Sequence, residues 1–215
     1  KELIDRLTNV DCRIRLGSLE VNVITEEFLK SLKKLKDFAP HFHLSLQSGS
    51  TAVLKTMNRH YTAEEFLKKC ELIRKYFPSA ALTTDIIVGY STETEENFEE
   101  SLETAGKAGF ADIHCFPYSK REGTVGAKLK EIPHEVKAER MERMLALKKE
   151  LKNKYIAENI GEIRYLVPEE IEDGYLAGYT ENYVRCYVKS DFMRKKLKVK
   201  LIEPFRDGAL AEIIE

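Results

Sequence analysis

Apolar and polar residues alternate strictly over the segment 41–47, which reads His-Phe-His-Leu-Ser-Leu-Gln. A period of two residues predicts a β-strand, here with phenylalanine and leucines on one face and polar side chains on the other. A strand of a helix-covered parallel sheet is usually apolar on both faces, because both are buried. The polar face therefore indicates that water or a ligand lies on that side of the sheet.

Similar segments recur through the first two-thirds of the chain. We expect strands at Cys12–Leu16, Phe42–Leu46, Leu82–Val88 and Asp112–Phe116. Polar residues alternate in the other three strands too, at Arg13 and Arg15, at Thr83 and Asp85, and at Asp112 and His114. We expect these polar faces to line one shared interior. A closed eight-stranded barrel fills its interior with apolar side chains, so the pattern favours an open or partial barrel. Chance alternation along edge strands is the alternative.

Amphipathic helices are expected between these strands. One begins at Thr25, and a second follows a capping box formed by Thr62 and Glu65. A third follows Thr92 and Glu95. Alternating strands and helices predict an α/β fold with a parallel sheet, either barrel-like or doubly wound.

The pattern changes near residue 160. A charged helix is expected from Pro133 to Asn159, where a following Ile-Gly supplies a stop signal. Beyond it we expect short strands at Ile163–Val167, Tyr175–Tyr179, Tyr183–Val188, Leu197–Ile202 and Leu210–Ile214, with hairpin turns at Glu172–Gly174 and Arg206–Gly208. So many short strands predict a small all-β barrel. The expected domains are residues 1–133, a linking helix at 134–160, and the barrel at 161–215.

The composition of the chain limits the classes of function that it can have. The 215 residues carry a formal net charge of −1, so any contact with nucleic acid must come from a local patch. Three of the four cysteines lie among apolar residues, where we expect buried thiols and no disulfides. His41 and His43 share a strand face but no third ligand is evident, so no metal site is expected. No signal peptide or membrane-spanning run is present, which indicates a cytoplasmic protein without a membrane partner.

Motifs stand at Arg13–Glu20, His43–Ser50, Met57–Thr62, Thr84–Gly89 with Glu93–Glu96, and Tyr118–Thr124. Together they resemble the radical S-adenosylmethionine (SAM) methylthiotransferases that modify tRNA. The terminal β segment, with Gly178–Tyr183, resembles the RNA-binding TRAM module. The motifs follow the family's order and spacing over nearly the whole chain. The Arg-Leu-Gly-Ser-Leu-Glu segment is most similar to the branch that acts on N6-threonylcarbamoyladenosine beside the anticodon.

The resemblance implies a partial radical-SAM TIM-like βα barrel, with its later strands only, followed by a TRAM-type barrel. It also implies a tRNA substrate, SAM, and two 4Fe–4S clusters in the complete enzyme. The family's CxxxCxxC motif and its amino-terminal cluster cysteines are not in this sequence, so no cluster ligand is expected here. Because the chain also begins at Lys1, we expect the later half of an enzyme, which partners its missing amino-terminal part. Alone, it is expected to be inactive; its oligomeric state stays open.

The resemblance implies that SAM contacts Gln47, Ser48, Arg59, Ser18, Glu20 and Asp85. A guanidinium matches a carboxylate in a bidentate way, so Arg59 is the candidate for the carboxylate of SAM. Each has a plainer alternative: a hydrogen-bonded turn, a surface ion pair, or a satisfied polar network that includes His114. No side chain stands out as catalytic. At Gly89-Tyr90-Ser91-Thr92 the sequence departs from the family's usual Gly-Phe-Pro-Gly.

In the terminal domain, the expected RNA contacts comprise a basic stripe and neighbouring polar or aromatic residues: Arg194, Lys195, Lys196, Lys198, Tyr179, Asn182, Tyr183 and Arg185. Cations bind phosphates and tyrosines stack on unpaired bases. A solvated strand face is the alternative. Two other functions compete with the enzyme: a non-catalytic RNA-binding module on a βα scaffold, and an unrelated phosphate-binding barrel. The TRAM-like tail and the lack of a glycine-rich phosphate loop argue against the second.

Overall fold

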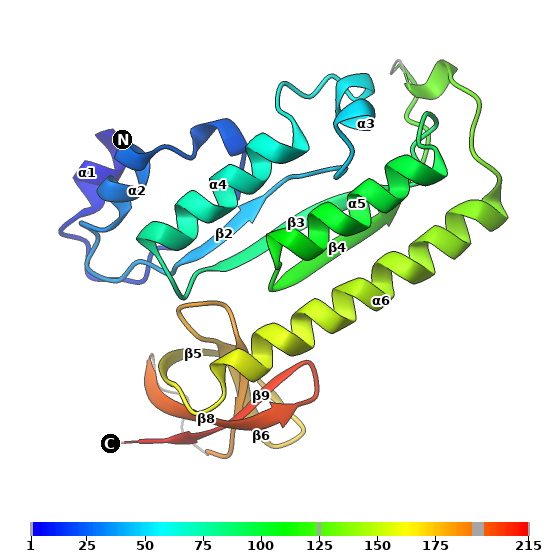
Figure 1. The fold of residues 1–215 in the computed structure, drawn as a ribbon. Coiled ribbons are helices and arrows are strands. Elements are labelled where there is room, and N and C mark those ends of the chain that lie inside the picture. Colours follow the sequence, from blue (N-terminus) through cyan, green and yellow to red (C-terminus); the bar gives the residue numbers. More distant parts are fainter. Residues whose placement is uncertain (1, 124–125, 191–195, 215) are drawn as a thin grey trace.

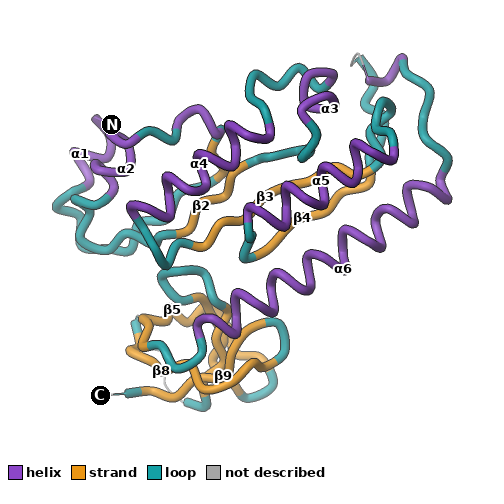
Figure 2. The backbone as a smooth tube through the Cα atoms, viewed as in Figure 1, coloured by secondary structure: helices purple, strands orange, loops and turns teal. Residues whose placement is uncertain are grey.

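The computed structural model describes residues 2–123, 126–190 and 196–214. In chain order its elements are α1 (Glu2–Leu7), β1 (Ser18–Leu19), the 3-10 helix η1 (Val21–Val23), α2 (Glu26–Leu32), β2 (His41–Leu44), α3 (Thr51–Thr56), α4 (Ala63–Tyr76), β3 (Ala81–Val88), α5 (Glu95–Ala108), β4 (Asp112–Pro117), the 3-10 helix η2 (Gly126–Lys128), α6 (His134–Asn159), β5 (Ile163–Glu172), β6 (Tyr175–Tyr179), β7 (Arg185–Val188), β8 (Leu197–Phe205) and β9 (Gly208–Ile213). Figures 1 and 2 show a helix-covered sheet joined by α6 to a small β domain.

The first sheet contains four parallel strands in the order β1-β2-β3-β4, which is also their order in the sequence. Sequential order is the arrangement of a βα barrel, whereas a doubly wound sheet reverses its order at a switch point. The register places His43 opposite Thr83, and Asp85 opposite His114. Polar residues from three strands therefore meet on one face, as the alternation predicted.

The other face of this sheet is apolar and carries the core. Phe42, Leu44 and Ile113 are fully buried, and they belong to one cluster with Phe66 of α4 and Phe98 of α5. Helices α4, α5 and α6 lie side by side over this face (Figure 1). Burying apolar side chains stabilises the fold by about 1.5–3 kcal/mol for each large residue.

Two expected details of this domain are wrong. The segment 12–16 is no continuous strand: it makes a single bridge, from Ile14 to Phe38, and the ladder forms only at β1. Its arginines bond through their side chains instead, Arg13 to Asp37 and Arg15 to His41. Helix α5 is capped by Thr94 with Asn97, not by Thr92 with Glu95, because Glu93 is buried in the preceding loop.

The terminal strands close into a barrel in the order β5-β6-β7-β9-β8. The expected turn at 172–174 is present: Asp173 and Gly174 both have positive φ, as a tight hairpin turn requires. Leu166, Leu176 and Val199 fill the barrel core. In α6, Met144 is buried against the sheet domain, whereas its neighbour Leu145 is exposed.

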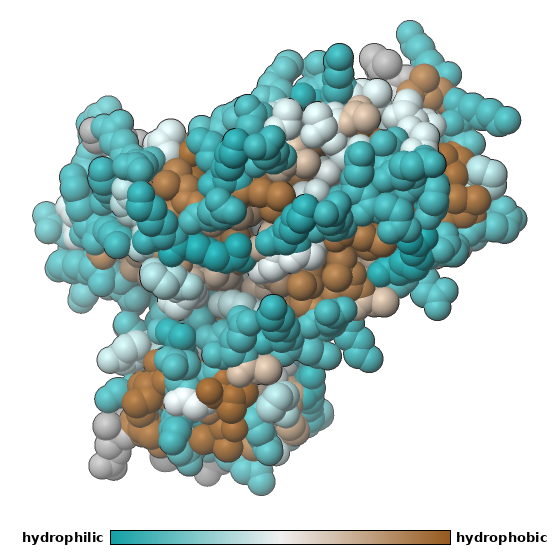
Figure 3. All heavy atoms as spheres, viewed as in Figure 1, coloured by the Kyte–Doolittle hydropathy of each residue, from teal (hydrophilic) through white to brown (hydrophobic). Residues whose placement is uncertain are grey.

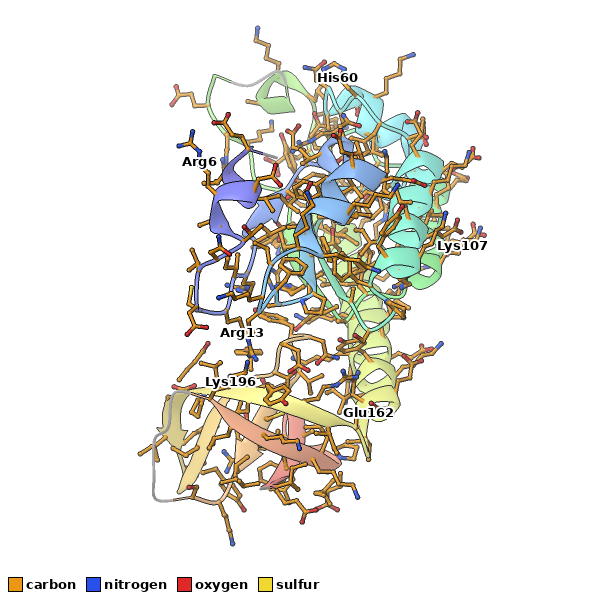
Figure 4. The ribbon with its side chains drawn as sticks, turned by 90° about the vertical axis from the view of Figure 1, so that its left-hand side faces the viewer. Arg6, Arg13, His60, Lys107, Glu162 and Lys196 are labelled. Atoms are coloured by element: carbon orange, nitrogen blue, oxygen red, sulfur yellow. The ribbon has the colours of Figure 1, made fainter. Side chains whose placement is uncertain are left out.

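The barrel packs against the amino ends of the sheet strands. The ring of Tyr183 stacks on His41, with centroids 3.8 Å apart. Asp37 of the sheet domain binds Lys196 of the barrel at 2.8 Å and Arg13 at 3.5 Å. Figure 4 shows Arg13 and Lys196 on opposite sides of this junction. The contacts of Tyr183 with His41 and of Lys196 with Asp37 connect residues that lie more than a hundred positions apart in the sequence.

The surface is mostly hydrophilic, with brown hydrophobic atoms over parts of both domains (Figure 3). In the part of the chain that the structure describes, no helix is long and apolar enough to cross a bilayer.

Candidate functional site

A cavity of about 600 Å³ opens at the carboxyl ends of the parallel strands. Gln47, Arg59 and Asp85 all line it, although they come from three separate segments. Small-molecule sites usually measure about 300–1,000 Å³, and parallel βα folds place them at this edge of the sheet. The structure thus brings together three of the six residues expected to bind SAM.

Gln47 is held in an unusual backbone conformation, with φ of 68°. Its N–H donates to Asp85 O, and its own carbonyl accepts from Ile87 N–H. The left-handed region costs a residue with a side chain roughly 1–2 kcal/mol. The two bonds to β3 hold this strained conformation at the edge of the cavity.

Arg59 reaches the cavity because helix α3 ends just before it. Asn58 adopts a left-handed conformation, which Asn tolerates well, and Arg59 N–H then bonds back to Leu54 O. Among the described residues, none pairs with the Arg59 guanidinium through a hydrogen bond or an ion pair. A partly buried, unpaired cation in a cavity is suited to bind a carboxylate.

Asp85 is the most constrained of the three residues. His43 Nε2 lies 3.2 Å from one carboxylate oxygen, and His114 Nδ1 lies 3.2 Å from the other. The register also forms a group that the sequence analysis did not select: candidate ligand atoms of His43, Asp85 and His114 lie within 4.8 Å of one another, and His41 is not part of it. Linear spacing missed this group, since strand register creates it.

Hydrogen bonds extend from Asp85 toward the barrel. His43 Nδ1 lies 3.0 Å from Thr83 Oγ1, and His41 Nε2 lies 2.8 Å from the same oxygen. Arg15 then bonds His41 Nδ1 at 3.2 Å. Burial, with the nearby charge of Arg15, lowers the pKa of His41 to about 3, so its ring stays neutral. Asp85 and His114 thus belong to a polar network, the plainer alternative considered for both.

The loop that departs from the family pattern is anchored to α6. Gly89 has φ of 78°, and its N–H donates to Glu93, whose carboxylate is buried and pairs with Arg140 at 3.0 Å. Burial raises the pKa of Glu93, while donors from Gly89 and Arg140 oppose that shift. This arrangement places Tyr90 against the cavity without the proline and glycine.

The other three expected SAM contacts lie elsewhere. Ser48 is fully buried, and its hydroxyl bonds Ser101 and the N–H of Ser50. Its side chain therefore supports the turn, which corrects the expected contact. Ser18 and Glu20 are exposed at the end of β1 but are outside the residues that line the cavity.

Residues that the sequence interpretation did not select form the apolar wall of the cavity: Met57, Ile87, Tyr90, Phe116 and Tyr118. Most lie inside motifs already noted. Phe116 was predictable from alternation, because it follows His114 by two residues and so shares its face.

The cavity fits SAM, since it offers a free guanidinium, a carboxylate, an amide and aromatic walls. A 4Fe–4S cluster does not fit the described residues. Cys70 and Cys186 are buried in different domains, Cys115 is half-buried and Cys12 exposed. Burial raises the pKa of Cys70 to about 12 and that of Cys115 to about 11, so neither thiol favours the thiolate form.

The expected RNA contacts divide into two groups. Lys198 is exposed. Lys196 is partly exposed, but its ammonium pairs with Asp37 of the sheet domain at 2.8 Å, and Arg194 and Lys195 lie outside the described residues. Tyr183 has His41 on one ring face and Tyr179 on the other, at 3.8 and 4.5 Å, so its ring is not available to stack on a base.

Two further candidates are also occupied. Asn182 has no exposed surface, and its side chain bonds Asn159 and Thr180. Arg185 pairs with Glu170, Glu172 and Asp207. Asn182, Tyr183 and Arg185 therefore make structural contacts within the protein, which leaves their side chains unavailable to RNA.

The sequence is similar to those of known protein families. Residues 2–105 match the Radical SAM superfamily. The chain is 36% identical to the threonylcarbamoyladenosine tRNA methylthiotransferase MtaB of Bacillus subtilis, over 100% of the chain and 50% of that protein. It is 37% identical to the tRNA-2-methylthio-N(6)-dimethylallyladenosine synthase of Caldicellulosiruptor saccharolyticus, over 94% of the chain and 44% of that protein.

A solved structure shares the fold. Coproporphyrinogen III oxidase (HemN) from Escherichia coli, described as a radical SAM enzyme, superposes with a TM-score of 0.57 at 19% identity, over 72% of this chain and 38% of that chain. The chain spans about half the length of the curated relatives it matches.

Proposed function

Because the chain belongs to the radical SAM family of tRNA methylthiotransferases, we propose that it forms the SAM-binding and tRNA-binding part of such an enzyme. We propose N6-threonylcarbamoyladenosine beside the anticodon as the substrate nucleoside, with methylthiolation at its C2 carbon. The first motif supports this choice over the dimethylallyl substrate, since the identity to relatives named for the two substrates is nearly equal, at 36% and 37%.

A single observation carries the proposal: Gln47, Arg59 and Asp85 converge on one cavity beside aromatic residues. Arg59 would bind the carboxylate of SAM in a bidentate way. Asp85 would accept from a ribose hydroxyl or an ammonium group, and Gln47 would add an amide contact. When bound, SAM supplies an activated sulfonium centre, and the residues of this chain orient it and exclude water.

The finer architecture is part of the same proposal. Residues 1–133 would form the later strands of a partial TIM-like barrel, residues 134–160 a linking helix, and residues 161–215 a TRAM-type domain. Within that domain, Lys198 is exposed and suited to a phosphate contact, whereas Lys196 would first have to leave its ion pair with Asp37. The clusters, which we propose number two in the complete enzyme, would be held by a part of the enzyme outside this sequence.

Arg59→Ala tests the cofactor site. Isothermal titration of SAM into the chain should show an affinity about 10- to 100-fold lower than that of the unaltered protein, since a charged hydrogen-bonding pair is lost. Lys55→Ala is the matched control: it removes an exposed cation from the same helical segment, outside the cavity lining. Equal affinity in both variants would contradict the assignment.

The rival function is an RNA-binding module on a βα scaffold, without catalysis. A chain that binds tRNA but not SAM would favour it. Iron analysis after reconstitution is a separate test, for which we expect no stoichiometric cluster because the cysteines are dispersed. A cluster of four irons per chain would show that this expectation is wrong.

A further inference from the structure

His114 and Phe116 form a surface that the cofactor contacts leave unused. They lie two residues apart on β4, opposite Asp85 and Ile87 of β3, so both face the polar side of the sheet. The exposed fraction is 49% for the His114 side chain and 51% for Phe116. Because Phe116 is half exposed and lines the cavity, its ring does not pack in the core.

The hydrogen bonds around Asp85 determine which nitrogen of His114 carries its proton. A carboxylate only accepts hydrogen bonds, so a neutral His114 must donate from Nδ1 to Asp85, and Nε2 is then an acceptor. The same rule makes His43 donate from Nε2.

The distant end of the network agrees with this assignment. Arginine only donates, so Arg15 makes His41 Nδ1 an acceptor, and His41 then donates from Nε2 to Thr83. The Thr83 hydroxyl is left to donate to His43 Nδ1. Each donor in this series of contacts, from Arg15 to His43, therefore has an acceptor. Among the described residues, His114 Nε2 has no hydrogen-bond partner and keeps its lone pair.

His114 lies between two openings. It lines a crevice of about 110 Å³ between β4, α6 and the terminal barrel, while its partner Asp85 and its neighbour Phe116 line the cofactor cavity. A crevice of that size is too small to enclose a nucleoside, so only the edge of a base can enter. An aromatic face beside a hydrogen-bond acceptor is how proteins hold an unstacked base.

We propose that His114 and Phe116 bind the target base of the RNA: Phe116 stacks on it, and His114 Nε2 accepts a hydrogen bond from an N–H on its edge. This inference rests on the proposed function, because it takes the substrate to be an N6-substituted adenine within tRNA. It places that base next to the cofactor cavity, one hydrogen bond from Asp85.

The tautomer of His114 provides a test that needs no activity. Long-range proton–nitrogen NMR spectra of the chain at pH 8.5, above the ordinary histidine pKa of about 6.5, should show His114 protonated at Nδ1. His41 and His43 should be protonated at Nε2. Asp85→Ala removes the acceptor and should return His114 to the Nε2–H form. An Nε2–H tautomer in the unaltered protein would overturn the inference.

RNA binding tests the contact itself. We would measure the affinity of the chain for an anticodon stem–loop that carries an N6-substituted adenosine, and for the same RNA with a purine lacking the exocyclic nitrogen. His114→Asn keeps an N–H that can reach Asp85 but has no acceptor at the position of Nε2. It should bind the first RNA about 10-fold more weakly and the second RNA unchanged.

Phe116→Leu should weaken both RNAs by about 10-fold or more, because stacking does not depend on the exocyclic nitrogen. Lys68→Ala, on the exposed side of α4, is the control. If His114→Asn weakens both RNAs equally, or neither, the proposed contact is wrong. If the unaltered chain binds no RNA, the proposed function fails instead, and the NMR spectrum still reports whether the His114 tautomer is as inferred.

Discussion

The two ends of the polar sheet face differ in how their charges and hydrogen bonds are satisfied. At the amino ends of the strands, Arg15, His41 and Thr83 bond one another beneath the ring of Tyr183. At the carboxyl ends, Arg59 has no such partner in the described part of the chain, and Phe116 is exposed to a cavity. One end uses polar residues to join two domains, whereas the other keeps them available. The same alternation in sequence therefore encodes a structural contact and a binding site.

The largest expected effect comes from breaking the ion pair that anchors the carboxyl-end loop. Arg140→Ala leaves the Glu93 carboxylate buried, with its charge unpaired. We expect the free energy of unfolding to fall by about 3–5 kcal/mol, measured by urea denaturation. Arg143→Ala is the control, because Arg143 is more exposed and also bonds Glu95; it should cost at most about 1 kcal/mol. Similar losses in the two variants would show that burial of the first pair is unimportant.

An intermediate effect is expected at the amino end, from pH. The pKa of His41 in the folded protein is about 3, below the unfolded value of about 6.5. Between these values the unfolded chain binds a proton that the folded chain does not, so stability falls as pH falls below 6.5. When one group binds a full proton only in the unfolded chain, the free energy of unfolding falls by about 1.4 kcal/mol per pH unit, or roughly 2–3 kcal/mol at pH 4.5.

Comparison of unfolding curves from pH 7 to pH 4.5 isolates this contribution. His41→Gln should be less stable at pH 7 but should lose less stability on acidification, because every other titrating group is unchanged. Parallel pH profiles for the two proteins would exclude His41 as the cause.

The smallest effect on stability concerns strain at the carboxyl end. Gln47→Gly removes the side chain from a residue with φ of 68°, and we expect a gain of up to about 1 kcal/mol in the free energy of unfolding. The same change should weaken SAM binding, since the amide is lost from the cavity. Loss of both stability and affinity would indicate that the Gln47 side chain supports the fold more than the ligand.

Local patterns in the sequence predicted most helices and strands. The features that they missed depend on contacts between residues far apart in the chain. The capping box of Thr62 and Glu65 is present as expected, because it depends on four neighbouring residues. The cap of α5 lies two residues later than the sequence analysis predicted. Glu93 is buried in the loop before it by its ion pair with Arg140, and no local pattern in the sequence indicates that pair.

Roles in the site followed the same division. Gln47, Arg59 and Asp85 could be selected from motifs, and all three reach one cavity. Tyr183 was expected to stack on RNA, but packing of the barrel against His41 decides its position. No local pattern in the sequence can predict a contact between two residues that lie 142 positions apart.

Helix α6 has a consequence for how these two ends can evolve. Its 26 residues make a rod about 39 Å long, with Arg140 tied to the cavity loop and Tyr155 donating to Asn182 of the barrel. Inserting one residue between these anchors would turn the barrel by about 100° relative to the sheet and carry Tyr183 away from His41. Insertions in this helix should therefore be tolerated only when they add whole helical turns. The length of the helix thus determines whether the barrel can contact the sheet domain.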